Sequence, residues 1–224
     1  MSLLSVQKLS MAIHDHPVLH DVTFEVAKGE IVAITGESGS GKSMTAFSVM
    51  GLTPGGAHAT GRIMLQDTDL LTQTEAQMCA LRGNAIGMVF QEPMTALNPV
   101  KTIGDQVAET ILIHGAGTRA EAMQIAADTL TRVGLPQDRF PLGRFPHELS
   151  GGQRQRVVIA MAIALRPALL IADEPTTALD VTTQAQILQL LAKLAREDDM
   201  GLLMITHDLA VVSEMADRIV VMQH

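Results

Sequence analysis

A short apolar segment that runs through a glycine-rich turn into a helical segment constrains this chain more than any other feature. Residues 31–34 read as a buried strand, and residues 42–50 read as a helix. Between strand and helix lie Gly36, Glu37, Ser38, Gly39, Ser40, Gly41, Lys42 and Ser43. Glycines let successive backbone amides point inward around an anion, and the following helix presents its positive end. The pattern predicts a phosphate-binding loop (P-loop), in which Lys42 reaches the β- and γ-phosphates of a nucleotide and Ser43 binds Mg²⁺.

Other short apolar runs predict the rest of an α/β core. They are continuous, as strands buried on both faces are, and they lie at residues 86–90, 169–172, 202–205 and 219–222. Helical stretches at residues 151–165 and 182–197 separate several of them, which predicts a parallel sheet. Near the N-terminus, Val22, Phe24 and Val26 alternate with polar residues instead. That alternation predicts a half-exposed antiparallel strand.

The pattern changes between residues 91 and 150. Residues 103–114 and 119–133 both read as helices, and no strand is predicted between them. Thr118 and Glu121 have the spacing of a capping box at the start of the second helix. This segment is therefore interpreted as a helical insertion into the α/β core.

Two acids follow one of the apolar strands. Asp173 and Glu174 come directly after residues 169–172, at the end of a predicted parallel strand, where such sheets place ligand chemistry. Beside a P-loop, Asp173 is expected to hold Mg²⁺, and Glu174 is expected to act on the attacking water as general base.

Charge and hydropathy exclude some classes of function. Sixteen Lys and Arg against twenty-four Asp and Glu give a net charge of −8, so general binding to nucleic acid is not expected. The longest run without a polar or charged residue is nine residues, at 157–165, whereas a membrane-spanning helix needs about twenty. A length of 224 residues fits one large domain, or one domain with an inserted subdomain.

A second anion cradle is predicted where residues 151–165 begin. Ser150, Gly151, Gly152 and Gln153 combine a hydroxyl, exposed amides and the positive end of a helix. Two phosphate sites in one chain make sense if two chains meet head to tail, each closing the nucleotide of the other.

With these landmarks the chain resembles the ATP-binding cassette (ABC) ATPases over its whole length. The P-loop, Gln91, residues 149–153, the Asp173–Glu174 pair, Asp180 and His207 occur in that family's order. The resemblance implies a P-loop NTPase (RecA-like) core with a mainly parallel sheet, an N-terminal antiparallel β subdomain and an inserted α-helical subdomain. It implies a single domain over residues 1–224, with residues 91–150 as the helical subdomain.

The resemblance also implies roles for residues that spacing alone does not assign. The implied ligands are ATP and Mg²⁺. The resemblance adds Thr45 to the nucleotide-binding residues of the loop, and it makes Lys42 a catalytic residue as well. Gln91 would contact Mg²⁺ and the water, and His207 would hold the γ-phosphate, the water and Glu174. Ser150 and Gly152 would bind the partner's γ-phosphate, flanked by Gly151 and Gln153, and Asp180 would organise the dimer interface.

A finer resemblance concerns residues 91–99, which are similar to the glutamine-loop segment of importer ATPases for dipeptides, oligopeptides and nickel. It implies a peripheral subunit on the cytoplasmic face of the inner membrane. Its partners would be a second ATPase chain (identical or paralogous), two permease subunits and, indirectly, an external solute-binding protein. Peptide is the first choice of substrate and nickel or another small solute the second. A soluble ABC ATPase acting on ribosomes or DNA is the rival class, but residues 91–149 contain no heptad run.

Two features depart from the family pattern. Most ABC ATPases stack an aromatic residue on adenine at the position of Ile13, and this chain contains no Tyr and no Trp. An aliphatic contact, or His14 or His16, would have to replace it, with weaker base selectivity. Related ATPases also continue past the strand that ends near His224, so a longer native chain is expected.

Overall fold

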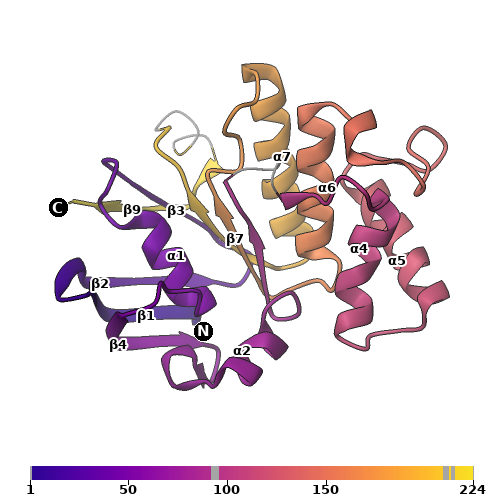
Figure 1. Cartoon of the computed structure of the whole chain (residues 1–224). Helices are drawn as coiled ribbons and strands as arrows, with labels where there is room; N and C mark the ends of the chain where they lie inside the picture. The colour runs from indigo at the N-terminus through magenta and orange to yellow at the C-terminus, as the bar shows by residue number, and fades with distance from the viewer. Residues whose placement is uncertain (1, 92–95, 209–211, 213–214, 224) are drawn as a thin grey trace.

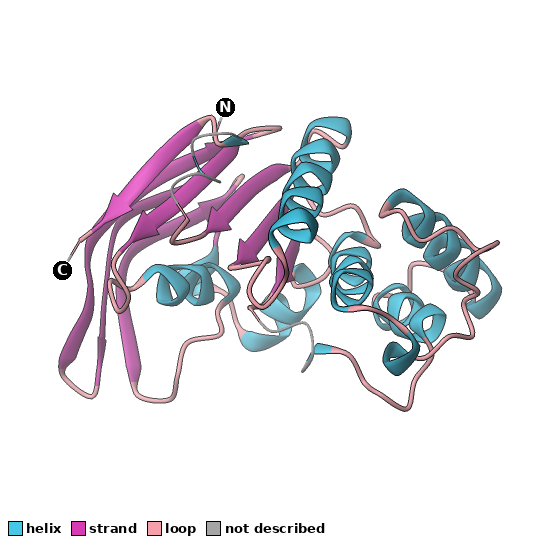
Figure 2. Ribbon diagram, turned by 90° about the horizontal axis from the view of Figure 1, so that it is seen from above, coloured by secondary structure: helices cyan, strands magenta, loops and turns pink. Residues whose placement is uncertain are grey.

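The computed structural model of the chain describes residues 2–223, except residues 92–95, 209–211 and 213–214. Two sheets and a group of helices make up the molecule (Figure 1). Seen from above, the strands gather on one side and most of the helices on the other (Figure 2).

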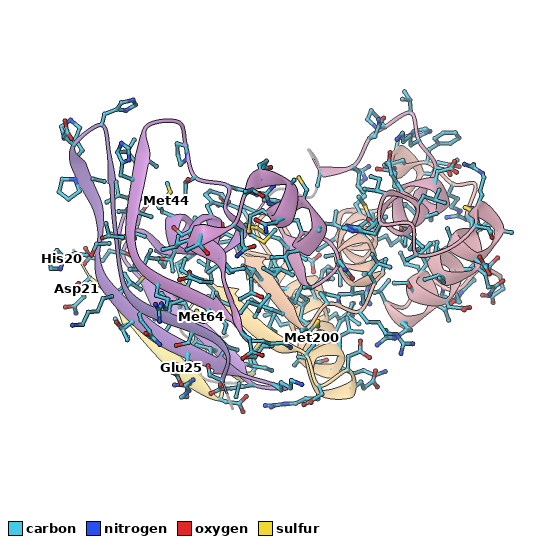
Figure 3. The ribbon with its side chains drawn as sticks, turned by 90° about the horizontal axis from the view of Figure 1, so that it is seen from below. His20, Asp21, Glu25, Met44, Met64 and Met200 are labelled. Atoms are coloured by element: carbon cyan, nitrogen blue, oxygen red, sulfur yellow. The ribbon has the colours of Figure 1, made fainter. Side chains whose placement is uncertain are left out.

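The N-terminal sheet is antiparallel and has the strand order β2-β1-β4-β5. Its strands are β1 (Ser2–Ile13), β2 (His16–Ala27), β4 (Ala57–Leu65) and β5 (Thr68–Asp69). His14 and Asp15 connect β1 to β2 with positive φ angles of 45° and 66°, as a tight hairpin turn requires. The predicted alternation in β2 is confirmed, because Phe24 and Val26 are buried whereas Glu25 is exposed. Figure 3 shows His20, Asp21 and Glu25 on the outer side of this sheet.

The second sheet is parallel throughout, with the strand order β6-β7-β8-β3-β9. Its strands are β3 (Ile31–Gly36), β6 (Ile86–Val89), β7 (Leu169–Asp173), β8 (Gly201–Ile205) and β9 (Arg218–Met222). The predicted parallel sheet is therefore confirmed. The prediction that all of its strands are buried on both faces is wrong for β9. This strand lies at the edge of the sheet, and Ile219 and Val221 are 50% and 63% exposed.

The helices cover both faces of the parallel sheet. α1 (Lys42–Met50) packs between the two sheets, where Val49, Ile34 and Leu4 share one buried cluster. A second cluster lies on the other face, against α4 (Ile103–Ile113), α5 (Arg119–Arg132), α6 (Gly151–Ile163) and α7 (Val181–Glu197). The sheet separates these clusters because successive residues of a strand point to opposite faces. In β7, Ile171 joins the first cluster and Leu170 the second.

The segment between β6 and α6 contains α4, α5 and the short 3₁₀ turn η2 (Pro146–Glu148), with no strand among its described residues. α4 packs on α5 and on α6, away from the N-terminal sheet (Figure 1). The predicted capping box opens α5, since Thr118 Oγ1 accepts from the Glu121 amide and the Glu121 carboxylate accepts from the Thr118 amide. The separation of residues 91–150 as a subdomain remains a prediction.

Part of the region between α1 and β6 was not predicted. It contains β4, β5, the 3₁₀ turn η1 (Leu70–Thr72) and α2 (Glu75–Leu81). The α2 helix also begins with a capping box, formed by Thr74 and Gln77.

Candidate functional site

The glycine-rich loop joins the end of β3 to the start of α1 as predicted. Its path requires glycine at Gly41, which has φ 90° and whose Cβ would lie 2.4 Å from Leu19 Cδ2 of β2. A Cβ on Gly36 would lie 2.1 Å from the carbonyl oxygen of Met222 in β9. The loop is therefore closed in by strands from both sheets, which leaves its backbone little room to move away from a ligand.

The start of α1 differs from the other α-helices that the structure describes. α2, α4, α5, α6 and α7 each begin with a Thr, Ser or Asp whose side chain accepts from a backbone amide. The N-cap residue of α1 is Gly41, which has no side chain that could accept a hydrogen bond, so the free amides of the first turn find no acceptor at the cap. Ser40 Oγ is buried and also lacks a hydrogen-bond partner among the residues that the structure describes. An anion would satisfy these donors, and the loop therefore fits the phosphates of a nucleotide.

Lys42 is held inside the loop. Its Nζ donates to the carbonyl oxygens of Gly36 at 2.9 Å and of Glu37 at 2.7 Å, and the residue is buried. Thr45, another predicted nucleotide-binding residue, is fully buried, and its Oγ1 donates to the carbonyl of Gly41 at 3.0 Å. Thr45 thus supports the loop from behind, whereas the Lys42 ammonium lies where phosphate oxygens would enter.

Two side-chain oxygens from distant parts of the chain meet beside the loop. Ser43 Oγ donates to Asp173 Oδ1 at 3.1 Å, which joins α1 to the end of β7. Burial raises the pKa of the Asp173 carboxyl above its usual range; the bond from Ser43 opposes this shift, and the charge of Glu174 adds to it. A hydroxyl and a carboxylate are the hard ligands that Mg²⁺ prefers, with phosphates and waters completing its shell. The pair therefore fits the predicted Mg²⁺ site.

Glu174 lies at the centre of a second group of side chains. Gln91 Nε2 donates to Glu174 Oε2 at 2.8 Å, and His207 Nδ1 lies 3.0 Å from Glu174 Oε1. Thr177 Oγ1 lies 3.3 Å from Oε2 as well, a contact that sequence reasoning missed. The ends of β6, β7 and β8 bring Gln91, Glu174 and His207 together, because these strands are parallel neighbours.

The loop and the Glu174 group open onto one cleft of about 640 Å³. Its walls are formed by Val18, Ser38, Gly39, Gly41, Lys42, Ser43, Met44, Gln91, Glu174 and His207. Sequence reasoning missed Val18 and Met44. Val18 is the extra residue of a β-bulge in β2, where Met11 and Ala12 of β1 pair with Leu19 and Pro17. A bulge turns one side chain out of the regular alternation, and no local pattern in the sequence indicates it.

The second predicted anion cradle lies elsewhere in the same chain. Ser150 caps α6, where its Oγ accepts from the Gln153 amide at 3.3 Å and Gln153 Oε1 accepts from the Ser150 amide at 2.9 Å. Ser150, Gly152 and Gln153 line a separate hollow of about 380 Å³ that shares no lining residue with the P-loop cleft. Gly151 is exposed at the same helix end, and a Cβ there would lie 3.3 Å from Leu179 Cδ2.

Asp180 is a helix cap in this chain. Its carboxylate accepts from the amide of Thr183 at 3.0 Å and from Thr183 Oγ1 at 2.7 Å, at the start of α7. These bonds hold the pKa of the exposed Asp180 carboxyl below its usual range. Thr183, which bonds to Asp180, also lines the Ser150 hollow, so the Ser150 and Asp180 groups adjoin each other. Among the described residues, neither Ser150 nor Asp180 lines the P-loop cleft.

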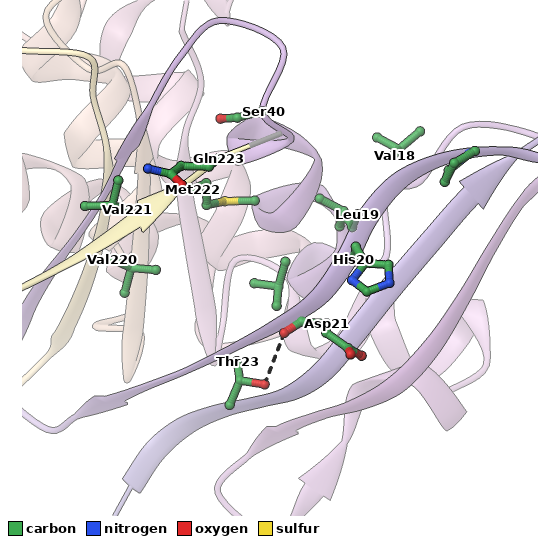
Figure 4. A pocket seen from close by; sticks show the side chains of 12 residues that line it. Val18, Leu19, His20, Asp21, Thr23, Ser40, Val220, Val221, Met222 and Gln223 are labelled. Atoms are coloured by element: carbon green, nitrogen blue, oxygen red, sulfur yellow. Dashed lines mark hydrogen bonds between the residues drawn. The ribbon is translucent and has the colours of Figure 1, made fainter.

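A further hollow of about 380 Å³ lies between β2 and β9 and reaches the loop at Ser40. Figure 4 shows Leu19, His20, Met222 and Ser40 around it. It shares Val18 with the P-loop cleft, and of the predicted site residues Ser40 lines it.

The fold and the loop together define a P-loop NTPase. The sequence profile of the ABC transporter family matches residues 19–177, and the chain belongs to that family. No helix among the described residues is both long enough and apolar enough to cross a lipid bilayer.

Several known proteins are similar to this chain. It is 52% identical over 226 residues to the peptidoglycan transport ATP-binding protein YejF of Agrobacterium fabrum, covering 98% of this chain and 41% of YejF. It is 52% identical over 208 residues to the oligopeptide transport ATP-binding protein AppD of Bacillus subtilis, covering 92% of this chain and 63% of AppD. The chain therefore spans less than two thirds of the length of either relative.

Solved structures show the same fold. A dimeric ATP-binding cassette, MJ0796 bound to ADP and Pi in a post-hydrolysis state, superposes with a TM-score of 0.83 at 30% identity, covering 98% of this chain and 94% of that one. The cbiO1 protein of Clostridium perfringens, part of the ABC transporter complex cbiONQ, gives a TM-score of 0.86 at 27% identity, covering 99% and 85%. Within the segment predicted to resemble importer ATPases, residues 92–95 lie outside the described residues.

Proposed function

We propose that this chain is the ATP-binding and ATP-hydrolysing subunit of a membrane importer for peptides. The observation that carries the proposal is the position of Glu174. Its carboxylate lies on the P-loop cleft between Gln91 at 2.8 Å and His207 at 3.0 Å. A carboxylate held in this way, beside a loop that fits phosphates, can orient a water molecule for attack on a terminal phosphate.

The residues predicted to be catalytic or to bind metal then each have a chemical task. The Lys42 ammonium would leave its two backbone carbonyls for the β- and γ-phosphate oxygens. Ser43 and Asp173 would hold Mg²⁺, which neutralises phosphate charge when it is bound. Glu174 would accept a proton from the attacking water, while Gln91 and His207 keep its two oxygens in place. Catalysis would thus depend on positioning and on charge stabilisation.

We propose that the Ser150 hollow completes the site of a second chain. In this chain the hollow is separate from the P-loop cleft, yet it combines a hydroxyl with the positive end of α6. Two chains related by a twofold axis would place the nucleotide of each against Ser150 and Gly152 of the other, with Asp180 at the interface. The partner would be an identical chain or a paralogue. The dimeric form of the similar MJ0796 cassette supports this arrangement.

An apolar hollow beside Gln91 supports docking of a permease. Phe90 is 41% exposed directly before Gln91. It lines a hollow of about 320 Å³ together with Met50, Met88, Ala96 and Met161. We propose that residues 91–150 form a helical subdomain and that one of two permease subunits binds at this hollow. A movement of Gln91 on ATP binding would then be transmitted to the permease through Phe90, its neighbour in the chain. The chain would lie on the cytoplasmic face of the inner membrane, without a nucleic-acid partner.

Peptide is proposed as the cargo because the names of the relatives agree on it more than on any other solute. They include an oligopeptide transport protein and a glutathione import protein of Escherichia coli that is 49% identical over 231 residues. Selection of the peptide would belong to the permease subunits and to an external binding protein.

The test is purification of the tagged chain from membranes of its native host. Glu174→Gln should trap the closed dimer in ATP and Mg²⁺, and an EDTA-treated sample is the matched control. We expect two polytopic membrane proteins and an ATPase chain to be retained with ATP and Mg²⁺ and reduced in EDTA. Recovery of soluble partners alone, such as ribosomes or repair proteins, would contradict the transport function.

A further inference from the structure

A buried glutamine connects α6 to the segment that follows the Glu174 carboxylate. Gln155 lies on α6 and is 0% exposed. Its Nε2 donates to the carbonyl oxygen of Pro175 at 2.7 Å, in a bond that is buried at both ends. A carbonyl only accepts, so the amide nitrogen has to face Pro175. Gln155 therefore holds the residue directly after Glu174.

The backbone of Glu174 needs such support. Glu174 has φ 44°, in the left-handed region that residues with a Cβ avoid. It also precedes Pro175, and the residue before a proline is pushed toward extended backbone. The Glu174 amide donates to the carbonyl of Ile205 at 2.9 Å, and the Thr177 amide donates to the carbonyl of Glu174 at 3.2 Å. A strained conformation of this kind persists only where the surrounding bonds impose it.

The other half of the Gln155 amide finds no partner in the part of the chain that the structure describes. There its Oε1 is buried and accepts no hydrogen bond. An apolar side chain of the same shape would remove this oxygen but would leave the buried Pro175 carbonyl without its donor. The bond to Pro175 is therefore the contribution of the amide at this position.

The position of α6 indicates what the bond between Gln155 and Pro175 connects. Five residues before Gln155, at the start of the same helix, Ser150 lines the hollow proposed to receive the nucleotide of the partner chain. α6 also packs on α4 and α5. A shift of α6 would therefore pull on the Pro175 carbonyl and change the direction of the Glu174 side chain.

We infer that Gln155 is a positioning residue, which ties the orientation of the Glu174 carboxylate to the position of α6 through the Pro175 carbonyl. The inference rests on the proposed function of Glu174 as general base. Through this bond, engagement of Ser150 by a partner would set the geometry of water attack in the chain that carries Ser150. Communication of this kind is a coupling between two sites.

The test is Gln155→Met, which keeps the length of the side chain and removes the amide. Gln106→Met is the matched control. Gln106 is also buried, and its amide bonds to Asn98 and Lys101 at 2.8–3.1 Å, away from the Glu174 segment. For both variants and the parent, kcat and KM for ATP are measured with the full chain, together with the melting temperature.

We expect Gln155→Met to lower kcat about tenfold while KM for ATP changes less than about threefold. Gln106→Met should lower the melting temperature at least as much and leave kcat within about twofold. A kcat for folded Gln155→Met equal to that of the parent would overturn the inference. If Gln155→Met does not fold, Gln155→Leu answers the same question.

Failure of the inference on Gln155 can be distinguished from failure of the proposed function. A parent chain that hydrolyses ATP, and loses this activity in Glu174→Gln, establishes the base independently of Gln155. A parent without ATP hydrolysis would contradict the proposed function itself. A fall in kcat that merely follows the melting temperature across both glutamine variants would show that Gln155 acts only through stability, and would also overturn the inference.

Discussion

Nδ1 of His207 lies 3.0 Å from Oε1 of Glu174, although 33 residues separate them along the chain. The contact exists because β7 and β8 are adjacent parallel strands and end at the same edge of the sheet. It leaves Glu174 with one oxygen toward His207 and the other toward Gln91, so the carboxylate has a defined direction in the P-loop cleft.

Glu174→Gln should abolish ATP hydrolysis and leave ATP binding intact. The amide keeps the shape of the side chain but cannot accept the proton of the attacking water, so kcat should fall by about a hundredfold or more. The Kd for ATP should stay within about threefold of the parent, because the P-loop is unchanged. Phosphate release and a fluorescent nucleotide titration measure the two quantities. Glu75→Gln is the control, since Glu75 is exposed on α2 and pairs with Arg82. Parental turnover in Glu174→Gln would refute the base assignment.

Gly41→Ala should destabilise the loop and weaken nucleotide binding. The new Cβ would lie 2.4 Å from Leu19 Cδ2, at a φ of 90° that alanine avoids. We expect a loss of about 1–2 kcal/mol in the free energy of unfolding, and ATP affinity reduced about tenfold or more as the first turn of α1 moves. Gly143→Ala is the control, because a Cβ there meets nothing within 4 Å. Urea unfolding measures the stability of both variants, and isothermal titration calorimetry measures their affinity for ATP. Equal effects of Gly41→Ala and Gly143→Ala would disprove the prediction.

Ser150→Ala and Thr118→Ala separate helix capping from function. Each residue caps a helix through a capping box, Ser150 on α6 and Thr118 on α5. Each substitution should therefore cost about 1 kcal/mol in the free energy of unfolding. Only Ser150→Ala should also lower ATP hydrolysis, by about tenfold, because Ser150 is proposed to bind the nucleotide of the partner. Equal hydrolysis by the two variants would leave Ser150 with a structural role alone.

Asp173→Asn should stabilise the metal-free chain at neutral pH. Burial raises the pKa of Asp173 in the folded state above its ordinary value of 3.8. Stability that comes from a raised pKa is present below the unfolded pKa and is lost as the pH rises through the folded pKa. The asparagine variant avoids that loss, so its free energy of unfolding should exceed that of the parent at pH 7.

Urea unfolding in EDTA between pH 3 and pH 8 measures the difference. The advantage of Asp173→Asn should shrink as the pH falls through the folded pKa, because the parent then becomes neutral at this position. The same variant should bind ATP more weakly when Mg²⁺ is present. Asp67→Asn, at an exposed position, controls for the substitution itself. A stability advantage that grows toward low pH would contradict the prediction.

Much of the fold could be predicted because it depends on short-range patterns. The apolar run of β3, the glycines after it and the start of α1 are consecutive, so a single local sequence pattern predicts the whole loop. The capping box of Thr118 and Glu121 is local in the same way, and it is confirmed. The prediction for β9 was wrong because an apolar run shows that a strand belongs to a sheet but not whether a neighbour covers it.

Other parts of the site depend on register and packing. Val18 lines the cleft at a bulge that shifts β2 by one residue against β1. Gln155 reads as an ordinary polar position in a helix, yet it is fully buried and bonded to Pro175. No local pattern identifies either residue, since their neighbours come from segments distant in the sequence.

By itself, then, the sequence determined the phosphate-binding loop, the acids that end β7 and the alternation of strands and helices, because each follows from the spacing of nearby residues. The local patterns also predicted that Ser43 and Asp173 both bind Mg²⁺, and the family resemblance implied that His207 holds Glu174. Only the tertiary structure determined that Gln91 donates to the Glu174 carboxylate, that Ser43 donates to Asp173, and that Ser150 lies in a hollow that shares no lining residue with the P-loop cleft. Those relationships depend on the order of strands in the sheet and on how helices pack across it. The free energy of burying apolar faces sets both, and it is a property of the whole chain.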